Sequence, residues 1–275
     1  MGWSFMRPLS LDHLTIIEAT PLELIQAAAA GGFEKVGLRI VRPTAAADVV
    51  DVIGQPQLQR DLKALMASTG VSIGLVEAIW LSADTDPSAL EPALATGAEL
   101  GARQVLVAGN DPDETRLCAN LSRLALDAKT YGLEIAFEFM PFTKVRSLEH
   151  AVRIMRQVAQ PNLRLLIDAL HVSRSGRDLR MLDRLDSSIV SYVHLCDAPA
   201  ALPPPEGLRD EARLGRLYPG DGELDLDAFL DAMPDDAPMG LEAPCRAYAH
   251  LPPIERGRIA GRITRAWLQR HDERR

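Results

Sequence analysis

The segment LEIAFEFM at residues 133–140 is followed thirty residues later by LRLLIDAL at residues 163–170, and both are apolar almost throughout. Strands of a parallel sheet that is covered on both faces have this continuous apolar character. Six further segments of the same kind lie along the chain: LDHLTII from Leu11, KVGLRIV from Lys35, VSIGLVEAI from Val71, RQVLVAG from Arg103, IVSYVHLC from Ile189 and MGLEAP from Met239. The sequence therefore predicts eight buried, parallel strands.

Between most of these segments the sequence carries the start and stop signals of helices. Thr20-Pro21-Leu22-Glu23 has the form of a capping box with Pro at the first helical position, and Gly31-Gly32 ends that helix. Further helices are predicted to start at Asp86-Pro87, at Asp111-Pro112-Asp113-Glu114 (ending at Gly132) and at Ser147, and the last helix is predicted over residues 253–269.

Eight strands, each followed by a helix, predict a single (β/α)8 TIM barrel, an α/β fold in one domain over residues 1–275. The alternative is a doubly wound open sheet, which shows the same alternation of strands and helices. Such sheets seldom have eight similar strands without a nucleotide-binding fingerprint, and the sequence contains neither a Gly-x-Gly-x-x-Gly nor a P-loop pattern.

The connection over residues 197–223 differs from the others in length and composition. It is rich in Pro, Gly and Arg, and it includes Pro203-Pro204-Pro205 and RLGRLYPGDG. Loops of this length are commonly functional or disordered. Because this one follows the seventh strand, we expect a lid over the C-terminal face of the barrel, where barrel enzymes carry their active sites.

The composition excludes several classes of protein. The 30 Lys and Arg residues against 38 Asp and Glu residues give a net charge of -8, so we expect no nucleic-acid partner and no membrane surface. The three cysteines lie far apart, none of them in a Cys-x-x-Cys pair, and the opening MGWSFMRPLS lacks signal-peptide features. We therefore expect a soluble, cytoplasmic protein. Its oligomeric state stays open, a homo-oligomer included.

Four of the later strands carry one ionisable residue near the C-terminal end of an apolar run: Glu138, Asp168, His194 and Glu242. A lone charge in such a strand is unfavourable unless it is paired or bound to a metal. The ends of strands five to eight converge in a barrel, so we expect the four side chains to point at one spot. Three carboxylates and an imidazole suit Mn²⁺, Mg²⁺ or Co²⁺ better than Zn²⁺, whose structural sites prefer thiolates. The alternative is four isolated polar residues at strand ends.

Two further residues near strand ends are candidates for contact with a substrate. His171 lies three residues beyond Asp168, where it could donate to a substrate oxygen, act as an acid or simply cap a helix. Glu77 on the third strand could orient a substrate hydroxyl, or it could pair with Arg39 or Arg103.

The predicted lid contains three arginines, which are Arg209, Arg213 and Arg216. Their guanidinium groups could clamp a carboxylate or a hydroxyl-bearing substrate, and we take Arg213 and Arg216 as candidate substrate contacts. The alternative is a solvated run of charges.

Several motifs follow one another in a recognisable order. They are Glu138 in a strand, Asp168-Ala169-Leu170-His171, His194-Leu195-Cys196-Asp197, PGDGELDL from Pro219, and Glu242 before an Ala-Pro pair. This order resembles the xylose isomerase-like TIM barrel superfamily of sugar (phosphate) isomerases and epimerases, and the resemblance covers essentially the whole chain. The superfamily includes ketose 3-epimerases, hydroxypyruvate isomerase, inosose dehydratase and 3-dehydroshikimate dehydratase.

The resemblance implies roles for the residues named above. Glu138, Asp168, His194 and Glu242 would hold one divalent metal ion. In the epimerases of the superfamily the two Glu positions also serve as the catalytic acid/base pair, and the position of His171 contacts the substrate.

Two positions depart from the ketose 3-epimerase pattern. Lys144 stands six residues after Glu138, where a second substrate-contacting Glu is expected, and Ala200 stands six residues after His194 in place of an Arg. A lid rich in Arg with Lys144 nearby suits an acidic substrate such as a hydroxy-keto acid. We therefore include Lys144 among the expected substrate contacts. The same features favour a reaction like that of the dehydratase members of the superfamily.

The principal interpretation is a metal-dependent isomerase or epimerase of a small polyhydroxy carbonyl compound. A metal that bridges a ketone oxygen and a neighbouring hydroxyl acidifies the α-carbon proton, a carboxylate removes this proton, and an enediolate forms. Return of a proton by Glu138 or Glu242 on the other face gives epimerisation or isomerisation. Loss of a β-hydroxyl, with His171 as the acid, instead gives a dehydratase (lyase) of the 3-dehydroshikimate or inosose type.

Two other classes of protein share the predicted fold. One is a non-catalytic barrel that binds a sugar. The other is a DNA-repair endonuclease, which needs three zinc ions and many histidines. The six scattered His residues and the charge of -8 argue against the endonuclease.

Overall fold

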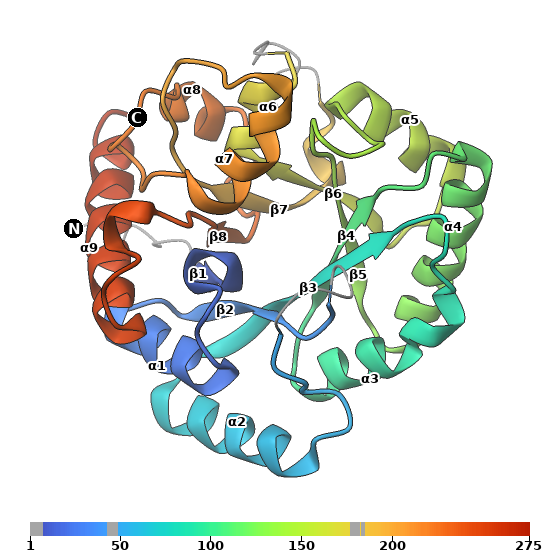
Figure 1. Ribbon diagram of the computed structural model, residues 1–275, viewed down its shortest axis with the longest axis horizontal. Coiled ribbons are helices and arrows are strands. Elements are labelled where there is room, and N and C mark those ends of the chain that lie inside the picture. Colours follow the sequence, from blue (N-terminus) through green and yellow to red (C-terminus); the bar gives the residue numbers. More distant parts are fainter. Residues whose placement is uncertain (1–7, 43–48, 177–181, 183–184) are drawn as a thin grey trace.

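Eight parallel strands close into a barrel in the part of the chain that the structure describes, which is residues 8–42, 49–176, 182 and 185–275 of a computed structural model. Each strand pairs with the next, and the last pairs with the first (Figure 1). The strands are β1 (Leu9–Asp12), β2 (Lys35–Arg39), β3 (Ser72–Leu81), β4 (Gln104–Gly109), β5 (Glu134–Glu138), β6 (Leu163–Asp168), β7 (Val190–Leu195) and β8 (Met239–Leu241). The (β/α)8 TIM barrel expected from the sequence is confirmed.

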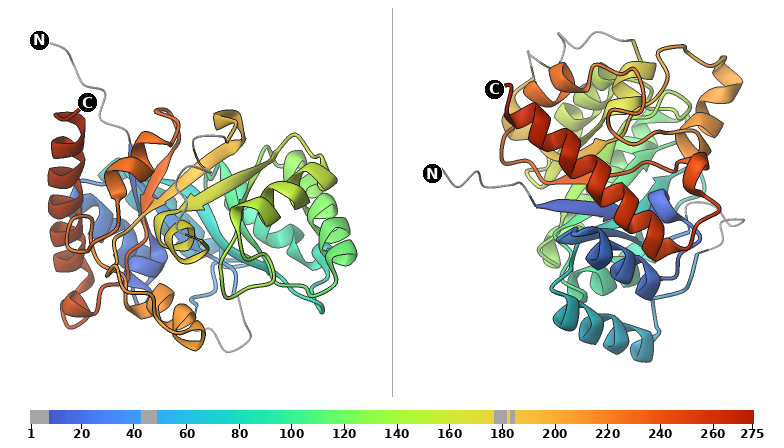
Figure 2. Two further views of the ribbon diagram at one scale, coloured as in Figure 1. Left: turned by 90° about the horizontal axis from the view of Figure 1, so that it is seen from above. Right: turned by 90° about the vertical axis from the view of Figure 1, so that its left-hand side faces the viewer.

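Helices surround this barrel, as the view in Figure 1 and the two turned views in Figure 2 show. The α-helices of the described residues are α1 (Pro21–Gly31), α2 (Pro56–Thr69), α3 (Glu91–Glu99), α4 (Glu114–Thr130), α5 (Leu148–Val158), α6 (Ala169–Arg174), α7 (Leu208–Leu214), α8 (Leu226–Asp231) and α9 (Pro253–Asp272). Of these helices, none is both long enough and apolar enough to pass through a membrane.

The ends of α1 and α5 follow from local hydrogen bonds. Thr20 forms the predicted capping box, because its side chain accepts from the Glu23 backbone N–H and the Glu23 side chain accepts from the Thr20 backbone. Helix α1 ends at Gly31, and Gly32 follows in the left-handed conformation that glycine adopts without strain. Ser147 caps α5 at the predicted position.

Two other helices begin later than the sequence predicts. Asp113, not Asp111, caps α4, because the Asp111 carboxylate is bound by the Arg116 guanidinium at 2.6 Å. Asp86 caps a short 3₁₀-helix over Pro87–Leu90, and α3 follows this turn.

Three strands are shorter than the apolar segments that predict them. β1 ends at Asp12, and the residues His13–Ile16 form a 3₁₀-helix instead of continuing the strand. β6 ends at Asp168, because this side chain accepts a hydrogen bond from the backbone N–H of His171 and so begins α6. β8 ends at Leu241.

Apolar side chains fill the inside of the barrel. Successive side chains of a strand alternate between its two faces, so a residue two positions after an inward-facing residue also points inward. Glu138, Asp168 and His194 are such residues, one layer nearer the C-terminal ends of their strands. The apolar cluster that they follow is made of Leu75, Ala78, Leu106, Ala136, Leu166 and Tyr192.

The connection over residues 197–223 is a folded segment with short helices. It contains a 3₁₀-helix over Pro205–Gly207 and the helix α7, which lies inside the ring of outer helices in Figure 1. Asp197 fixes the C-terminal end of this segment, because its carboxylate accepts hydrogen bonds from the backbone N–H groups of Gly220, Gly222 and Leu224 at 2.9 to 3.0 Å.

Candidate metal centre and its cavity

The four residues expected to bind a metal come from four neighbouring strands. Glu138 and Asp168 end β5 and β6, His194 is the next-to-last residue of β7, and Glu242 directly follows β8. All four residues are buried. One donor atom from each of them lies within 4.8 Å of the others. The structure thus brings this set together at the C-terminal end of the barrel.

The atoms at the centre of this cluster lack hydrogen-bond partners. His194 Nδ1 lies 3.4 Å from both Glu138 Oε1 and Glu242 Oε2, and 3.6 Å from Asp168 Oδ2. Among the described residues, neither ring nitrogen of His194 nor Glu138 Oε1 makes a well-aligned hydrogen bond. Buried polar atoms without partners are unfavourable and uncommon. Three carboxylates beside an imidazole are also a donor set for a hard divalent cation, so the residues present fit a metal ion.

The charges of the cluster favour a cation at its centre. Burial raises the pKa of the Glu138 carboxyl to about 7, against the effect of His194. Burial alone would lower the pKa of His194, but the surrounding carboxylates, led by Glu242, raise this pKa well above its usual value. The carboxylates therefore stabilise positive charge at this point, and a divalent ion would supply it.

Arg216 from the connection over residues 197–223 reaches the same cluster. Its Nη1 donates to Asp168 Oδ2 at 2.6 Å, its Nη2 lies 2.9 Å from Glu242 Oε2, and its Nε donates to the Ala212 carbonyl. Burial disfavours the charged form of Asp168, but the Arg216 guanidinium outweighs it and holds the pKa of that carboxyl below its usual range. Arg216, expected to contact a substrate, lines the cavity wall and binds two of the candidate ligands.

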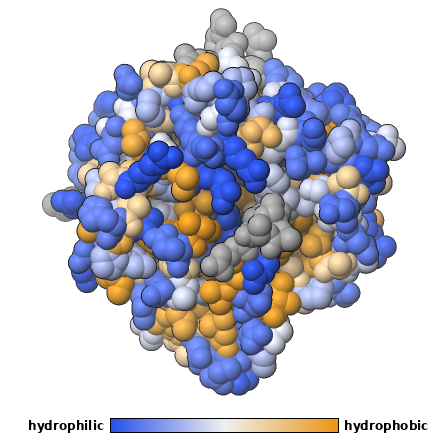
Figure 3. Space-filling view, viewed as in Figure 1, coloured by the Kyte–Doolittle hydropathy of each residue, from blue (hydrophilic) through white to orange (hydrophobic). Residues whose placement is uncertain are grey.

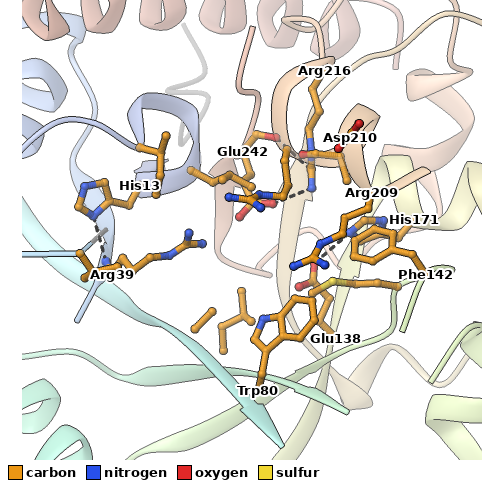
Figure 4. A pocket seen from close by; sticks show the side chains of 18 of the residues that line it. His13, Arg39, Trp80, Glu138, Phe142, His171, Arg209, Asp210, Arg216 and Glu242 are labelled. Atoms are coloured by element: carbon orange, nitrogen blue, oxygen red, sulfur yellow. Dashed lines mark hydrogen bonds and ion pairs between the residues drawn. The ribbon is translucent and has the colours of Figure 1, made fainter. Parts of the chain in front are cut away.

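A cavity of about 700 Å³ opens above the cluster. Figure 3 shows the face in which it opens, hollowed near its middle, and Figure 4 shows the side chains that surround it. Glu138 and Glu242 lie in its lining, together with His13, Arg39, Trp80, Phe142 and His171.

His171 is buried and lines the cavity beside Glu138. Its Nε2 lies 4.0 Å from Glu138 Oε1, and its ring packs edge-on against Phe142 with the ring centres 5.6 Å apart. Burial lowers the pKa of His171 to about 4. The ring is therefore neutral near pH 7, and it can donate one hydrogen bond to a substrate oxygen.

Glu77 lies beside the cavity but is not part of its lining. Its Oε1 accepts from the His13 backbone N–H at 3.2 Å, and its Oε2 accepts from Arg39 Nη2 at 3.0 Å. Burial raises the pKa of Glu77 to about 8, and the Arg39 guanidinium opposes this shift. Of the two roles considered for Glu77, the structure shows the pairing with Arg39, and it is Arg39 that lines the cavity.

The two other expected substrate contacts are placed differently. Lys144 is exposed in the turn after β5 and does not line the cavity, because its two neighbours in sequence are buried and its own side chain faces solvent. Arg213 of α7 does line the cavity, as does Arg209, whose guanidinium carbon lies 5.9 Å from the centre of the Trp80 ring.

Three residues of the site escape sequence reasoning. Asp12 ends β1, is fully buried, and has its Oδ2 only 3.1 Å from His194 Nε2. Arg39 ends β2, and Trp80 is the next-to-last residue of β3. A polar or large residue near the end of an apolar strand is the signal that identifies Glu138, and it could have identified Arg39 and Trp80. Asp12 gives no such signal, because the apolar run LDHLTII continues past it.

The chain was compared with known proteins by sequence. The sequence model of the xylose isomerase-like TIM barrel family matches residues 25–269. Inosose isomerase of Bacillus subtilis (strain 168) is 33% identical over 115 residues, which are 41% of this chain and 40% of that protein. 3-Dehydroshikimate dehydratase of Pseudomonas aeruginosa is 30% identical over 138 residues, which are 48% of this chain and 21% of that protein. The matches thus span less than half the length of either relative.

The fold was compared with solved structures. The crystal structure of the IOLI protein with a bound zinc atom has a TM-score of 0.77, and the likeness covers 97% of this chain and 99% of that one. The two sequences are 19% identical, so this likeness concerns the fold.

Proposed function

We propose, from the premise that this chain belongs to the xylose isomerase-like TIM barrel family, that it is a divalent-metal-dependent isomerase or epimerase of a small polyhydroxy carbonyl compound. The proposal is carried by one observation: four buried donor groups lie within 4.8 Å of one another below a cavity. The donor set suits Mn²⁺, Mg²⁺ or Co²⁺. Zinc, which the IOLI structure contains, belongs in the same test.

The two glutamates of the cluster can move a proton. A metal ion bound there would draw electrons from a substrate carbonyl and its neighbouring hydroxyl, which acidifies the adjoining C–H bond. Glu138 and Glu242 both line the cavity, so one carboxylate can take the proton and the other can return one. Burial raises the pKa of Glu138 to about 7 in the metal-free chain, and a bound divalent ion would lower it, which leaves the carboxylate ready to accept a proton.

The upper part of the cavity suits a substrate with an acidic group. Arg39 from β2 and Arg209 from α7 both extend toward the cavity (Figure 4), and Arg213 lines it as well. A guanidinium binds a carboxylate through two parallel hydrogen bonds, and it also donates to hydroxyls. A hydroxy-keto acid would therefore place its carbonyl end at the cluster and its carboxylate among these arginines.

The same arginines favour a second candidate, a metal-dependent dehydratase (hydro-lyase) of the 3-dehydroshikimate or inosose type. Loss of water requires an acid that protonates the departing hydroxyl. His171 has its pKa lowered to about 4 by burial, so it holds no second proton at neutral pH. Glu138, with a pKa of about 7, would have to supply this proton. The isomerase also needs a protonated group, but either of the two glutamates that line the cavity can be that group, whereas elimination needs a further acid at the departing hydroxyl. We therefore place the isomerase first.

A substrate panel in heavy water separates these reactions. The protein, loaded in turn with Mn²⁺, Mg²⁺, Co²⁺ and Zn²⁺, is incubated with ketoses, hydroxy-keto acids, inosose and 3-dehydroshikimate. An isomerase or epimerase incorporates deuterium at the carbon beside the carbonyl, which NMR detects. A dehydratase instead yields a conjugated or aromatic product that absorbs in the ultraviolet. A chelator should abolish either reaction.

Variants identify the residues responsible. Glu138→Gln and Glu242→Gln should lose the reaction, whereas Glu149→Gln is the matched control because Glu149 is exposed on α5 and does not line the cavity. Neither deuterium uptake nor elimination with any of the four ions would contradict the proposal. It would favour the non-catalytic, sugar-binding barrel.

A further inference from the structure

Asp12 is a buried carboxylate with no part in the chemistry described above. It is the last residue of β1 and is 0% exposed. Its Oδ2 lies 3.1 Å from His194 Nε2, while the other ring nitrogen, Nδ1, faces the three candidate ligand carboxylates at 3.4 to 3.6 Å. The imidazole of His194 therefore stands between Asp12 on one side and the metal centre on the other.

Hydroxyl groups hold the Asp12 carboxylate in this position. Ser10 Oγ donates to Asp12 Oδ1 at 2.6 Å, and the Tyr192 hydroxyl lies 3.1 and 3.2 Å from the two carboxylate oxygens. Tyr192 is two residues before His194 on β7, so both side chains point into the barrel. The same strand thus supplies the imidazole and a group that orients its carboxylate partner.

The neighbouring strands leave space for this carboxylate by carrying glycine. A Cβ atom at Gly37 on β2 would lie 2.4 Å from Asp12 Oδ1, and one at Gly240 on β8 would lie 1.8 Å from Asp12 Oδ2. Gly37 pairs with Asp12 across β1 and β2, and Gly240 pairs with His194 across β7 and β8. Any larger side chain at these two positions would displace the carboxylate.

We propose that Asp12 is a positioning residue of the metal centre: its carboxylate, 3.1 Å from His194 Nε2, favours the imidazole proton on that nitrogen and so keeps the Nδ1 lone pair turned toward the three carboxylates. A neutral imidazole carries one proton, so a proton held at Nε2 leaves Nδ1 free to bind a metal. A carboxylate behind a metal-binding histidine also fixes the ring orientation and makes the ligand nitrogen more basic. This inference rests on the metal-dependent function proposed above.

The test is the metal affinity of the variant Asp12→Asn, measured by competition with a chromophoric chelator. Asn keeps the size of the side chain but offers its amide N–H₂ as well as its oxygen, so the Nε2–H tautomer loses its charged acceptor. We expect the dissociation constant to rise about 10- to 100-fold. The visible absorption spectrum of the Co²⁺-loaded protein should change as well, because it reports the ligand geometry rather than activity.

A double-mutant cycle shows whether Asp12 acts through His194. In a His194→Gln background, Asp12→Asn should leave the remaining affinity for the metal unchanged. The variant Tyr192→Phe removes only the hydroxyl beside Asp12, so it gives a milder, separate test should Asp12→Asn fail to fold. We expect a smaller loss of affinity from it than from Asp12→Asn.

Two results would overturn the role of Asp12 alone. One is wild-type affinity in folded Asp12→Asn and Tyr192→Phe proteins. The other is an equal loss of affinity from Asp12→Asn with and without His194. A wild-type chain that binds no divalent ion would overturn both this inference and the proposed function, so the two failures are distinguishable.

Discussion

Two groups of polar residues lie on different sides of the same cavity, and they differ in how their carboxylates are satisfied. One group contributes Arg39 and His13 to the lining, and the other contributes Glu138 and Glu242 (Figure 4). On one side, Glu77 accepts hydrogen bonds from the Arg39 side chain and the His13 backbone. On the other side, Glu138 Oε1 and His194 Nδ1 have no well-aligned hydrogen bond within the described ranges. Burial of a charge alone therefore does not indicate a binding site. A buried donor set that the chain leaves unsatisfied does, because an external group must then compensate its desolvation.

The largest expected effect is on catalysis at the unsatisfied group. Glu242→Gln removes a proton-transfer group and a metal ligand, and we expect kcat to fall about 10²- to 10⁴-fold. Steady-state kinetics with the substrate found in the panel measure this fall. Glu149→Gln, on the exposed face of α5, should stay close to the wild-type rate. Equal rates for Glu242→Gln and the wild type would exclude Glu242 from the reaction.

The second prediction compares how much Glu77 and Glu138 contribute to the free energy of unfolding. Glu77→Met leaves the partly buried Arg39 guanidinium and the His13 backbone N–H without their acceptor, so we expect a loss of about 3 kcal/mol in the free energy of unfolding. Glu138→Met removes a carboxylate that repels its neighbours, so the metal-free protein should lose much less. Urea unfolding in the presence of a chelator measures both values. A larger loss of stability from Glu138→Met than from Glu77→Met would refute this prediction.

A pH-dependent effect on folding stability is expected from His13, whose backbone N–H donates to Glu77. Burial lowers the pKa of His13 to about 4 from its ordinary 6.5, so the folded protein favours the neutral ring. The stability that this residue contributes is present above pH 6.5 and is lost as the pH falls toward 4, by about 3 kcal/mol in total.

The variant His13→Asn isolates this contribution. Its amide oxygen can replace Nδ1 as the acceptor of the Arg39 backbone N–H, but it does not titrate. Urea unfolding of the metal-free protein at several values between pH 4 and pH 7 should show a shallower loss of stability on acidification than in the wild type. Parallel curves for the two proteins would contradict the assignment.

The smallest effect is expected at the rim of the cavity. Arg209→Met removes the contact of its guanidinium with the Trp80 ring, which is worth about 0.5 to 1 kcal/mol at an exposed site. We expect a nearly unchanged melting temperature, together with a several-fold higher KM for an acidic substrate at unchanged kcat. Arg123→Met, which removes an exposed arginine of α4, is the matched control. An unchanged KM would show that Arg209 does not contact the substrate.

The architecture was accessible from the sequence because local patterns determine it. Apolar runs identify the strands, and the Thr20 capping box identifies the start of α1. The start of α4 was not accessible, because Asp111 and Asp113 offer two overlapping signals, and only the contact with Arg116 decides between them.

The residues of the site could be predicted from the sequence only where the ends of the strands were predicted well. Glu138, Asp168, His194 and Glu242 could be grouped because each stands near the end of an apolar run. Asp12 could not be added, since the run LDHLTII continues past it, and the strand end therefore cannot be recognised.

Which buried acid finds a partner within the chain also depends on tertiary structure. Glu77 and Glu138 look alike in sequence, each near the end of an apolar run, although the structure places Glu77 in the middle of β3 and Glu138 at the end of β5. Arg39 stands 38 residues from Glu77 and reaches it because β2 and β3 pair in a register that sets these two residues side by side.

The central claim is that four side chains from separate strands bind one divalent ion, and metal analysis combined with calorimetric titration tests it most directly. We predict one ion per wild-type chain. At a free-ion concentration 100 times Kd, the bound ion should raise the free energy of unfolding by about 2.7 kcal/mol. Binding should be severely weakened in His194→Gln and retained in Glu149→Gln. A wild-type chain that takes up no ion, or a His194→Gln chain that binds as tightly as the wild type, would contradict the account.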